Sequence, residues 1–450
     1  MTNDMTTGNP AKIIFLFALP ILLGSVFQQF YSMADTIIVG RFIDYKALAA
    51  VGSTGSMSFL ILGFVMGLSS GFAVIVAQRF GAKDEEGVRR SVATSIFLCT
   101  ITTIIFTTLS MVIARPLLVV MNTPDDIFQE AYTYIMIIFA GTGAIMFYNM
   151  ASSILRALGD SKTPLYFLII SSILNIILDI VFIVTFKMGV AGAALATVVS
   201  QIISVILCVF YMIKHYPILH LTRKDFQLNS TFAWKHLSLG LPMAFQFSIT
   251  AIGVIILQSS LNLFGSVKIA AFTAASKVEG LVCQGAPTFG VAMANYTGQN
   301  LGADNIPRIR KGVVASSFLT LGFSFAASFI VILFAEPLTK LFITDVDPMV
   351  LDEIYAGARE YLKMCAIFFP SLFLLFIYRN VLQGIGKSFW PLMGGVIELV
   401  IRSIVAFTLP KVIGYTGICL AGPLAWVGAC VLLFIAYIVT FRKMHSASPS

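Results

Sequence analysis

The sequence predicts an all-α polytopic membrane protein with twelve transmembrane helices in two six-helix lobes, and three observations support this prediction. First, 58% of the 450 residues are hydrophobic and only 11% are charged, whereas a soluble domain carries about 25% charged residues. Second, apolar runs of about 20 residues recur along the chain, each long enough to cross roughly 30 Å of hydrocarbon. Third, the two halves of the chain repeat one another. Because backbone amides in lipid need internal partners, the apolar runs are expected to be helices.

The internal repeat is clearest in a six-residue phrase. Residues Gln78–Lys83 read Gln-Arg-Phe-Gly-Ala-Lys, and residues Gln299–Asp304, about 221 positions later, read Gln-Asn-Leu-Gly-Ala-Asp. Three other features occur once in each half, namely a basic pair after the phrase, a Leu-Pro step in the first apolar run, and a glycine five residues before a proline (Arg89-Arg90 and Arg310-Lys311; Leu19-Pro20 and Leu241-Pro242; Gly159 with Pro164 and Gly386 with Pro391). Repeats of this size in an apolar chain are typical of transporters.

The apolar runs fall into two groups of six. The expected spans are 12–41, 46–78, 91–114, 126–155, 164–186, 189–213, 233–263, 268–298, 312–335, 355–381, 391–411 and 417–441. We therefore expect an N-lobe at 1–214, a cytoplasmic linker at 215–232 and a C-lobe at 233–450. An even number of spans per half returns the chain to its starting side, so the lobes should be related by a pseudo-two-fold axis along the membrane normal.

The loop charges predict the orientation in the cell inner (cytoplasmic) membrane. With the N-terminus inside, about eighteen Lys and Arg residues fall in cytoplasmic segments and about nine fall outside, as the positive-inside rule requires. The loop 336–360 is expected outside, and its acidic residues fit that side (Asp345, Asp347, Asp352, Glu353). Both termini are expected in the cytoplasm.

Several function classes have no support in the sequence. The net charge of +8 comes from basic residues scattered over short loops, so it does not indicate a nucleic-acid partner. The six cysteines lack metal-ligand spacing, and the four histidines lie in the linker or the tail. A Gly-x4-Gly-Lys-Ser/Thr loop for nucleotides is also absent from the sequence. We expect no catalytic residues, and no cofactor other than a coupling ion.

Ionisable groups inside the spans are the main functional signal, because an intramembrane charge is expensive and marks a site by default. Asp35 lies about 9 Å below the outer end of the first span, and Asp179 lies at a similar depth in the fifth. Asn175 precedes Asp179 by one helical turn, and Thr197 lies about 13 Å deep in the sixth span. Such oxygen-rich groups suit Na⁺, and paired carboxylates can share a proton.

The second half lacks this carboxylate pair, since residues 240–263 contain no acid. Its intramembrane charges are Lys277 and Glu279 in the eighth span, and Glu398 and Arg402 one turn apart in the eleventh. Arg402 and Glu279 count to roughly 12–16 Å below the outer surface. Two interpretations remain open, an ion pair that only stabilises the lobe and a substrate contact in the central cleft.

Longer motifs carry a resemblance to a known family. The stretch 28–40 reads Gln-Gln-Phe-Tyr-Ser-Met-Ala-Asp-Thr-Ile-Ile-Val-Gly, and 47–52 reads Ala-Leu-Ala-Ala-Val-Gly. The stretch 156–164 reads Arg-Ala-Leu-Gly-Asp-Ser-Lys-Thr-Pro. Together with the doubled Gly-Ala loops, these motifs make the chain similar to the MATE (multidrug and toxic compound extrusion) family over nearly its whole length, and to its DinF-like prokaryotic branch in particular. The resemblance implies export of small hydrophobic, often cationic compounds by cation antiport with H⁺ or Na⁺.

The same resemblance implies site residues. In the DinF-like branch the coupling ion binds in the N-lobe, and the matching positions here are Asp35, Asn175, Asp179, Thr197, Asn149 and Tyr134. Asn149 counts deeper than the others, so its inclusion requires a bent fourth helix. The NorM-like branch has a glutamate in its seventh helix that this chain lacks. Substrate-cleft candidates are Gln28, Lys277, Glu279, Glu398 and Arg402.

The predicted mechanism is alternating access by a monomer in membrane lipid. Prolines inside spans remove backbone hydrogen bonds and permit bends, so we expect hinges at Pro20, Pro242, Pro287 and Pro370. The main alternative function is a flippase for lipids or lipid-linked oligosaccharides, which would need a cationic groove. A membrane-embedded enzyme and a passive channel or receptor are weaker alternatives, because the sequence shows no intramembrane catalytic motif and does show a buried carboxylate pair.

Overall fold

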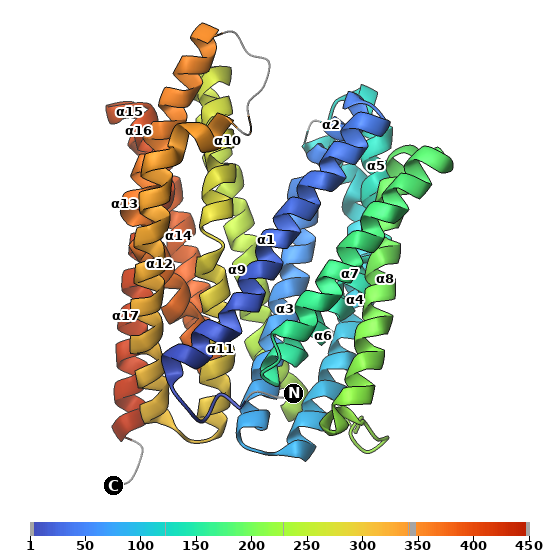
Figure 1. The fold of residues 1–450 in the computed structure, drawn as a ribbon, viewed down its shortest axis with the longest axis vertical. Helices are drawn as coiled ribbons and strands as arrows, with labels where there is room; N and C mark the ends of the chain where they lie inside the picture. Colours follow the sequence, from blue (N-terminus) through green and yellow to red (C-terminus); the bar gives the residue numbers. More distant parts are fainter. Residues whose placement is uncertain (1–3, 122, 228, 341, 343–347, 447–450) are drawn as a thin grey trace. The chain divides into compact units, whose positions relative to one another are not determined.

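The computed structural model describes residues 4–121, 123–227, 229–340, 342 and 348–446, and the described chain is built of helices (Figure 1). Two acidic residues of the predicted outer loop, Asp345 and Asp347, lie outside this part. The helices of the first half are α1 (Pro10–Phe42), α2 (Tyr45–Ser53), α3 (Gly55–Gly81), α4 (Glu85–Val120), α5 (Asp125–Ala140), α6 (Thr142–Ala157), α7 (Lys162–Asp179), the π-helix η1 (Ile180–Thr185) and α8 (Gly189–His215). The linker contains the 3₁₀ turn η2 (Pro217–Leu219).

The second half repeats this order of long helices. Its elements are α9 (Ser230–Leu261), η3 (Asn262–Phe264), α10 (Gly265–Val282), α11 (Gly285–Gly302), α12 (Ile306–Lys340), α13 (Pro348–Ile385), α14 (Phe389–Thr408), α15 (Pro410–Ile413), α16 (Tyr415–Cys419) and α17 (Ala421–Ser446).

The prediction of an all-helical, multi-span membrane protein is confirmed. The described residues contain 10 helical segments long and apolar enough to cross a membrane, and the bent pair α5 and α6 makes up to 11. One of these segments, Ser230–Gly302, is 73 residues long, which at 1.5 Å per residue is far more than one crossing needs. It turns at Gly265, whose φ is +80°. Dividing it there gives the expected twelve spans.

By packing, the chain divides into two compact units. Unit 1 comprises residues 1–6, 19–248 and 298–304, and unit 2 comprises 7–18, 249–297 and 305–450. The first helix of each half, α1 or α9, therefore begins in one unit and ends in the other. In α1 the change falls next to Pro20, and in α9 it falls six residues after Pro242.

The repeated phrase has the same conformation in both copies. Each copy ends a helix, and its sixth residue, Lys83 or Asp304, adopts a left-handed backbone with φ of 57° or 54°. The next residue then caps the following helix, because Asp84 accepts a hydrogen bond from the Gly87 amide at 2.8 Å and Asn305 accepts one from the Arg308 amide at 3.1 Å. The sequence repeat thus specifies the same helix end and the same N-cap of the following helix in both halves.

The glycine of each copy packs against the glutamine backbone of the other copy within unit 1. A Cβ added to Gly81 would lie 1.9 Å from the carbonyl oxygen of Gln299, and one added to Gly302 would lie 1.8 Å from that of Gln78. Real Cβ atoms never come this close, so both positions require glycine. The ends of α3 and α11 therefore touch backbone to backbone, each through the glycine of its own phrase.

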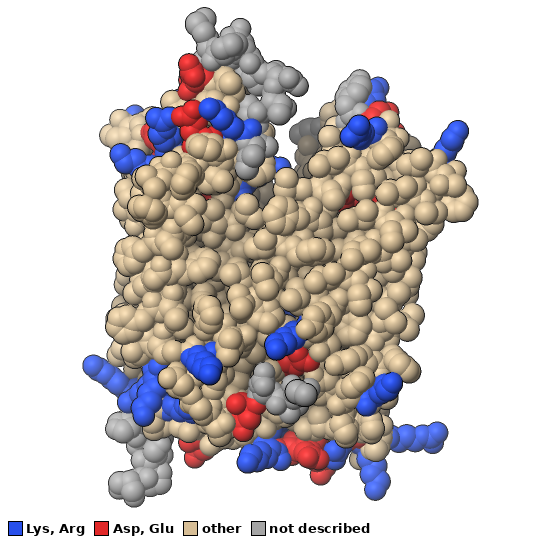
Figure 2. Space-filling view, in the orientation of Figure 1, with Lys and Arg blue, Asp and Glu red and all other residues tan. Residues whose placement is uncertain are grey.

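Each unit has its own apolar core and an apolar outer face. In unit 1, α3 packs against α4 and α6 around Phe72; in unit 2, α13 packs against α10, α12 and α17 around Phe369 and Phe373 (Figure 1). Large apolar side chains are also exposed along the helices, for example Phe318 and Phe325 of α12. On the face shown in Figure 2, charged side chains gather at the helix ends and leave a broad uncharged band between them. A lipid-facing surface explains this band.

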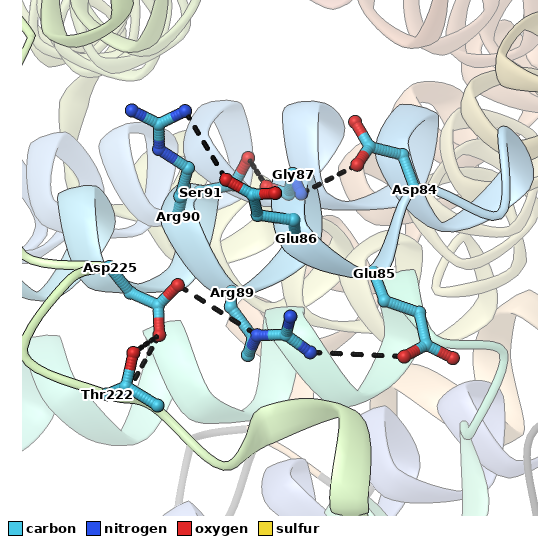
Figure 3. A network of polar contacts seen from close by, with 9 residues as sticks. All are labelled: Asp84, Glu85, Glu86, Gly87, Arg89, Arg90, Ser91, Thr222 and Asp225. Atoms are coloured by element: carbon cyan, nitrogen blue, oxygen red, sulfur yellow. Dashed lines mark hydrogen bonds and ion pairs between the residues drawn. The ribbon is translucent and has the colours of Figure 1, made fainter.

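The predicted linker is held against unit 1 by a polar network (Figure 3). Asp225 is buried and accepts hydrogen bonds from the amide and hydroxyl of Thr222, and its carboxylate lies 3.9 Å from Arg89 of α4. Burial raises the pKa of Asp225, but the Thr222 hydrogen bonds and the charges of Arg89 and Arg90 outweigh it, so the pKa is lowered overall.

Candidate functional site

Two carboxylates meet inside unit 1. Asp35 in α1 and Asp179 at the end of α7 lie within hydrogen-bond reach of each other. Asp179 is fully buried, and Asp35 Oδ1 is buried with no hydrogen-bond partner among the described residues. Because two carboxylates this close repel one another when both are ionised, the pair strongly favours a bound cation or proton.

Polar groups on neighbouring helices surround this pair. Asn175, 1% exposed and one turn before Asp179, donates its side-chain amide to the Thr197 hydroxyl at 3.3 Å. Tyr31 of α1 also shares a hydrogen bond with Thr197 and acts electrostatically on both carboxyl groups. Tyr134 of α5 lies close enough to both aspartates to act on them electrostatically. The structure thus brings together five of the six predicted coupling residues and adds Tyr31.

The backbone is irregular directly after Asp179. There α7 gives way to the π-helix η1 (Ile180–Thr185), a conformation that appears rarely and often at functional sites. The wider turn begins at the residue that carries the buried carboxyl group. Asp179 therefore lies where the backbone changes from α-helical to π-helical geometry.

Asn149, the sixth predicted residue, depends on a bend that is present. The fourth span is broken at Gly141, where α5 and α6 meet at 46°. A Cβ on Gly141 would lie 2.3 Å from Val198 of α8, so glycine allows the close approach of α8 at this break. The Asn149 amide donates to the Ile145 carbonyl of its own helix at 2.8 Å.

A cavity in unit 1 adjoins the carboxylate pair. Its volume is about 350 Å³, and its lining includes polar residues of α1, α6 and α8 (Gln28, Tyr31, Asn149, Arg156, Thr197, Gln201). Tyr31 and Thr197 belong both to this lining and to the surroundings of the carboxylates. The predicted cleft residue Gln28 therefore lies in the same cavity as the predicted coupling residues Asn149 and Thr197. The volume falls in the range of small-molecule sites.

The charges of the second half form a separate buried cluster in unit 2. Arg379 of α13 donates to Glu398 of α14, and Arg402 lies one turn from Glu398 with its Nη2 3.9 Å from Glu398 Oε2. Glu279 of α10 accepts a hydrogen bond from the Tyr361 hydroxyl at 2.5 Å. Arg402 acts on Glu279 electrostatically, but its described ion pair is with Glu398.

One expectation about buried charge was wrong, and one buried charge was not predicted. Lys277, expected inside the lobe, is exposed in the described structure. Arg379, which is 6% exposed, is a buried charge that was not predicted. Arg379 was missed because the tenth span was expected to end near 381, which placed this residue at the cytoplasmic boundary, whereas α13 continues to Ile385. Tyr31 could have been found, since it lies one helical turn before Asp35 on the same face.

A metal site of the transition-metal type finds no support in the part of the chain that the structure describes. No group of three or more His, Cys, Asp or Glu side chains there could hold such an ion. The oxygen atoms of the predicted set are of the kind that hard cations such as Na⁺ prefer.

Comparison with known proteins agrees with this architecture. The chain is 29% identical to the probable multidrug resistance protein YpnP of Bacillus subtilis over 403 residues, which cover 86% of this chain and 88% of that protein. It is 27% identical to the probable multidrug resistance protein NorM of Thermotoga maritima, with coverage of 93% and 88%. The crystal structure of MATE in complex with MaL6 superimposes with a TM-score of 0.90 at 23% identity, covering 99% of both chains.

The family itself is established by a match over most of the chain. The MatE family profile matches residues 20–181 and 242–408, one segment in each half. The matched segments include α7 and its Asp179 in the first half, and α14 with Glu398 and Arg402 in the second. The chain therefore belongs to the MATE family and is a multi-span multidrug transporter.

Proposed function

We propose that this transporter exports small hydrophobic, often cationic compounds in exchange for H⁺ or Na⁺, and that Asp35 and Asp179 bind the coupling ion. The observation that carries the coupling proposal is the contact of these two carboxyl groups in a buried layer of unit 1. The buried Asp35 Oδ1 has no described hydrogen-bond partner, and a proton or a cation would satisfy it. We also propose that this chain exports the same kinds of compound as its multidrug relatives.

The surrounding groups have distinct roles in this proposal. Asn175 and Thr197 supply neutral oxygen atoms, which would complete a shell around Na⁺ or hydrogen-bond a shared proton. Tyr31 connects Thr197 to the carboxylates, and Tyr134 closes the site from α5. With the ion bound, repulsion between Asp35 and Asp179 is relieved.

Ion binding can then bias the conformation of the transporter. A ligand shifts an equilibrium only by its differential affinity for the two states. Bending at Pro20 would move the part of α1 that carries Tyr31 and Asp35, because Pro20 removes a backbone hydrogen bond within the helix. In the conformation where the carboxylates separate, they would bind the ion less well. The ion gradient would therefore favour the ion-bound conformation when the site is open to the side with more ion, and the ion-free conformation when it is open to the other side.

The cavity of unit 1 provides a place where the compound and the ion can influence each other. Because Tyr31 and Thr197 border both the cavity and the carboxylate pair, a compound that displaces either side chain would change affinity for the ion. By thermodynamic linkage the ion would change affinity for the compound by the same factor. Exchange of compound for ion is the expected result.

We assign the chain to the DinF-like branch on the same residues, and we expect a monomer with both termini in the cytoplasm. The lobes 1–214 and 233–450 remain our division of the sequence repeat, with 215–232 as the linker between them. A flippase for lipids or lipid-linked oligosaccharides stays the second candidate. It is favoured by one observation, the excess of buried arginine over glutamate in the cluster of Arg379, Glu398 and Arg402.

Proteoliposomes with separately imposed H⁺ and Na⁺ gradients would test the proposal. Uptake of the cationic dye ethidium into inside-out vesicles should follow one of the two gradients. Replacement of Asp35 by Asn should abolish this uptake while the protein remains monodisperse on size exclusion. Dye transport that ignores both gradients would contradict coupling, and scrambling of a fluorescent phospholipid without dye transport would favour the flippase.

A further inference from the structure

Arg402 of α14 is an unusual residue for the interior of a membrane helix bundle. Its side chain is 8% exposed, and its guanidinium carries five N–H donors. In the part of the chain that the structure describes, its Nε is buried without a hydrogen-bond partner. A buried donor without an acceptor is costly, so the site calls for an acceptor.

The nearest carboxylate does not supply one. Arg402 Nη2 lies 3.9 Å from Glu398 Oε2, which exceeds hydrogen-bond length. Glu398 is already engaged by Arg379, whose guanidinium donates directly to Glu398 Oε1. Two buried arginines thus share one glutamate, and Arg402 has the weaker share.

The carboxylate of Glu279, on α10, is also occupied. Glu279 accepts the Tyr361 hydroxyl at 2.5 Å, and no ion pair within 4.0 Å joins it to Arg402 among the described residues. Arg402 acts on Glu279 only at longer range. A side chain would therefore have to move before Glu279 could accept a hydrogen bond from Arg402 in place of the one from Tyr361.

The backbone beside Arg402 leaves room for its guanidinium. Gly253 of α9 lies against it, and a Cβ at Gly253 would come within 2.9 Å of Arg402 Nη1. Gly253 therefore allows the guanidinium to lie where it does. This glycine belongs to a helix whose neighbouring residues, Val254 and Ile255, are exposed.

We propose that Arg402 binds a carboxylate group carried by the transported compound. The planar guanidinium fork matches a carboxylate in geometry and charge, and a polar group held unsatisfied in a membrane interior marks a binding site by default. This inference rests on the proposed export function and adds Arg402 to it as a residue that determines specificity.

Two dyes with the same chromophore test the proposal directly. Rhodamine 110 carries a free carboxylate, and rhodamine 123 is its methyl ester. Binding of each to the purified full-length protein in nanodiscs would be followed by fluorescence polarisation. Replacing Arg402 by Gln should weaken binding of rhodamine 110 by roughly 10-fold or more, the cost of a charge-assisted hydrogen bond, and change that of rhodamine 123 by less than about 2-fold. An equal loss for both dyes, or no loss for either, would overturn the proposal.

Three further variants, one of them a control, keep the test decisive if Arg402→Gln does not fold. Gly253→Ala should displace the guanidinium and selectively weaken rhodamine 110, whereas Gly280→Ala on α10, with no atom within 4 Å of the added Cβ, should affect neither dye. Glu279→Gln removes a competing negative charge and should leave rhodamine 110 binding unchanged or tighter. Weaker rhodamine 110 binding in Glu279→Gln would show that Arg402 serves Glu279 and would reject the proposal.

The binding measurement is independent of coupling. It needs no ion gradient, so failure of gradient-driven export would reject the proposed antiport and leave the dye comparison intact. Conversely, normal export of rhodamine 123 with no preference of the wild-type protein between the dyes, and no selective effect at Arg402, would reject only the carboxylate site.

Discussion

Asp179 ends α7 with its carboxyl group within hydrogen-bond reach of Asp35, which lies on a helix 144 positions earlier in the sequence. The contact forms because α1 and α7 present their carboxylates at the same level, and because Asn175 and Thr197 provide polar surroundings for them. A site of this kind is sensitive to the loss of one charge.

We expect Asp35→Asn and Asp179→Asn each to abolish gradient-driven dye export while leaving the yield of folded protein unchanged. Each substitution keeps the size of the side chain and removes the repulsion that makes ion binding favourable. Asn175→Ala should weaken ion dependence by a smaller amount. Dye efflux from energised proteoliposomes measures this, with Asp125→Asn at the exposed start of α5 as the matched control. Wild-type pumping by Asp35→Asn would redirect attention to the charges of unit 2.

Tyr31→Phe should reduce the apparent affinity for the coupling ion without abolishing transport. The substitution removes one hydroxyl that bonds to Thr197 next to the carboxylates, a loss of about 1 kcal/mol or roughly 5-fold in affinity. The ion concentration for half-maximal dye transport is the appropriate measurement. Tyr166→Phe, on an exposed part of α7, is the control, and an identical effect of both substitutions would exclude a specific role for Tyr31.

Gly81→Ala and Gly302→Ala should each destabilise the protein by about 1–3 kcal/mol or more, the usual cost of overpacking. In both cases the new methyl group would overlap a backbone carbonyl oxygen, which cannot move away as a side chain can. The measurement is the thermal unfolding midpoint in detergent. Gly52→Ala in α2 has open space around the added carbon and should be neutral or slightly stabilising; equal behaviour of all three variants would contradict the close contact.

Single cysteines in the linker and in an outer segment, in a background without native cysteines, can show which side of the membrane each lies on. The side of the termini follows from this result. Replacement of exposed Lys224 in the linker should allow labelling only from the cytoplasm, and replacement of exposed Asp352 at the start of α13 should allow it from outside. An impermeant maleimide applied to intact cells distinguishes the two. Labelling at 224 but not at 352 would invert the proposed topology.

Asp225→Asn should lower stability at neutral pH, and the difference from wild type should vanish in acid. Because the pKa of Asp225 in the folded protein lies below its ordinary value of 3.8, its ionised form contributes stability that is fully present above that value. The contribution is lost as pH falls through the lower, folded pKa. We expect a loss of about 1–3 kcal/mol at pH 7, seen as a lower unfolding midpoint that converges with wild type only once the pH has fallen below the lowered pKa of the folded state. A difference that persists there would assign the effect to the Thr222 contacts alone.

The fold was predictable because its causes are local in sequence. Apolar length identifies membrane helices, and the two copies of the phrase identify the symmetry, which the left-handed residues Lys83 and Asp304 reproduce in three dimensions. Most of the candidate coupling site was also accessible, since Asp35 and Asp179 are charges where charge is expensive. Tyr31 was also predictable, because it lies one helical turn before Asp35 on the same face of the helix.

Other features depend on tertiary packing and could not be predicted. The burial of Arg379 follows from the continuation of α13 beyond the apolar run. The π-helix after Asp179 has no sequence signal that we recognise. Similarly, the sequence shows that Arg402 is an intramembrane charge, but it does not show that Glu398 already accepts a hydrogen bond from Arg379.

The backbone contact between the two copies of the repeated phrase bears on the ancestry of the chain. Gly81 needs the glutamine of the other copy as its neighbour, and Gly302 needs that of the first. A half-length ancestor with one copy would have found this neighbour only in a second molecule, related by two-fold rotation. Gene duplication and fusion would thus have turned an interface between subunits into an internal contact. The two copies have since diverged at Arg79, Phe80 and Lys83, but neither glycine can be enlarged without disturbing the half that it does not belong to.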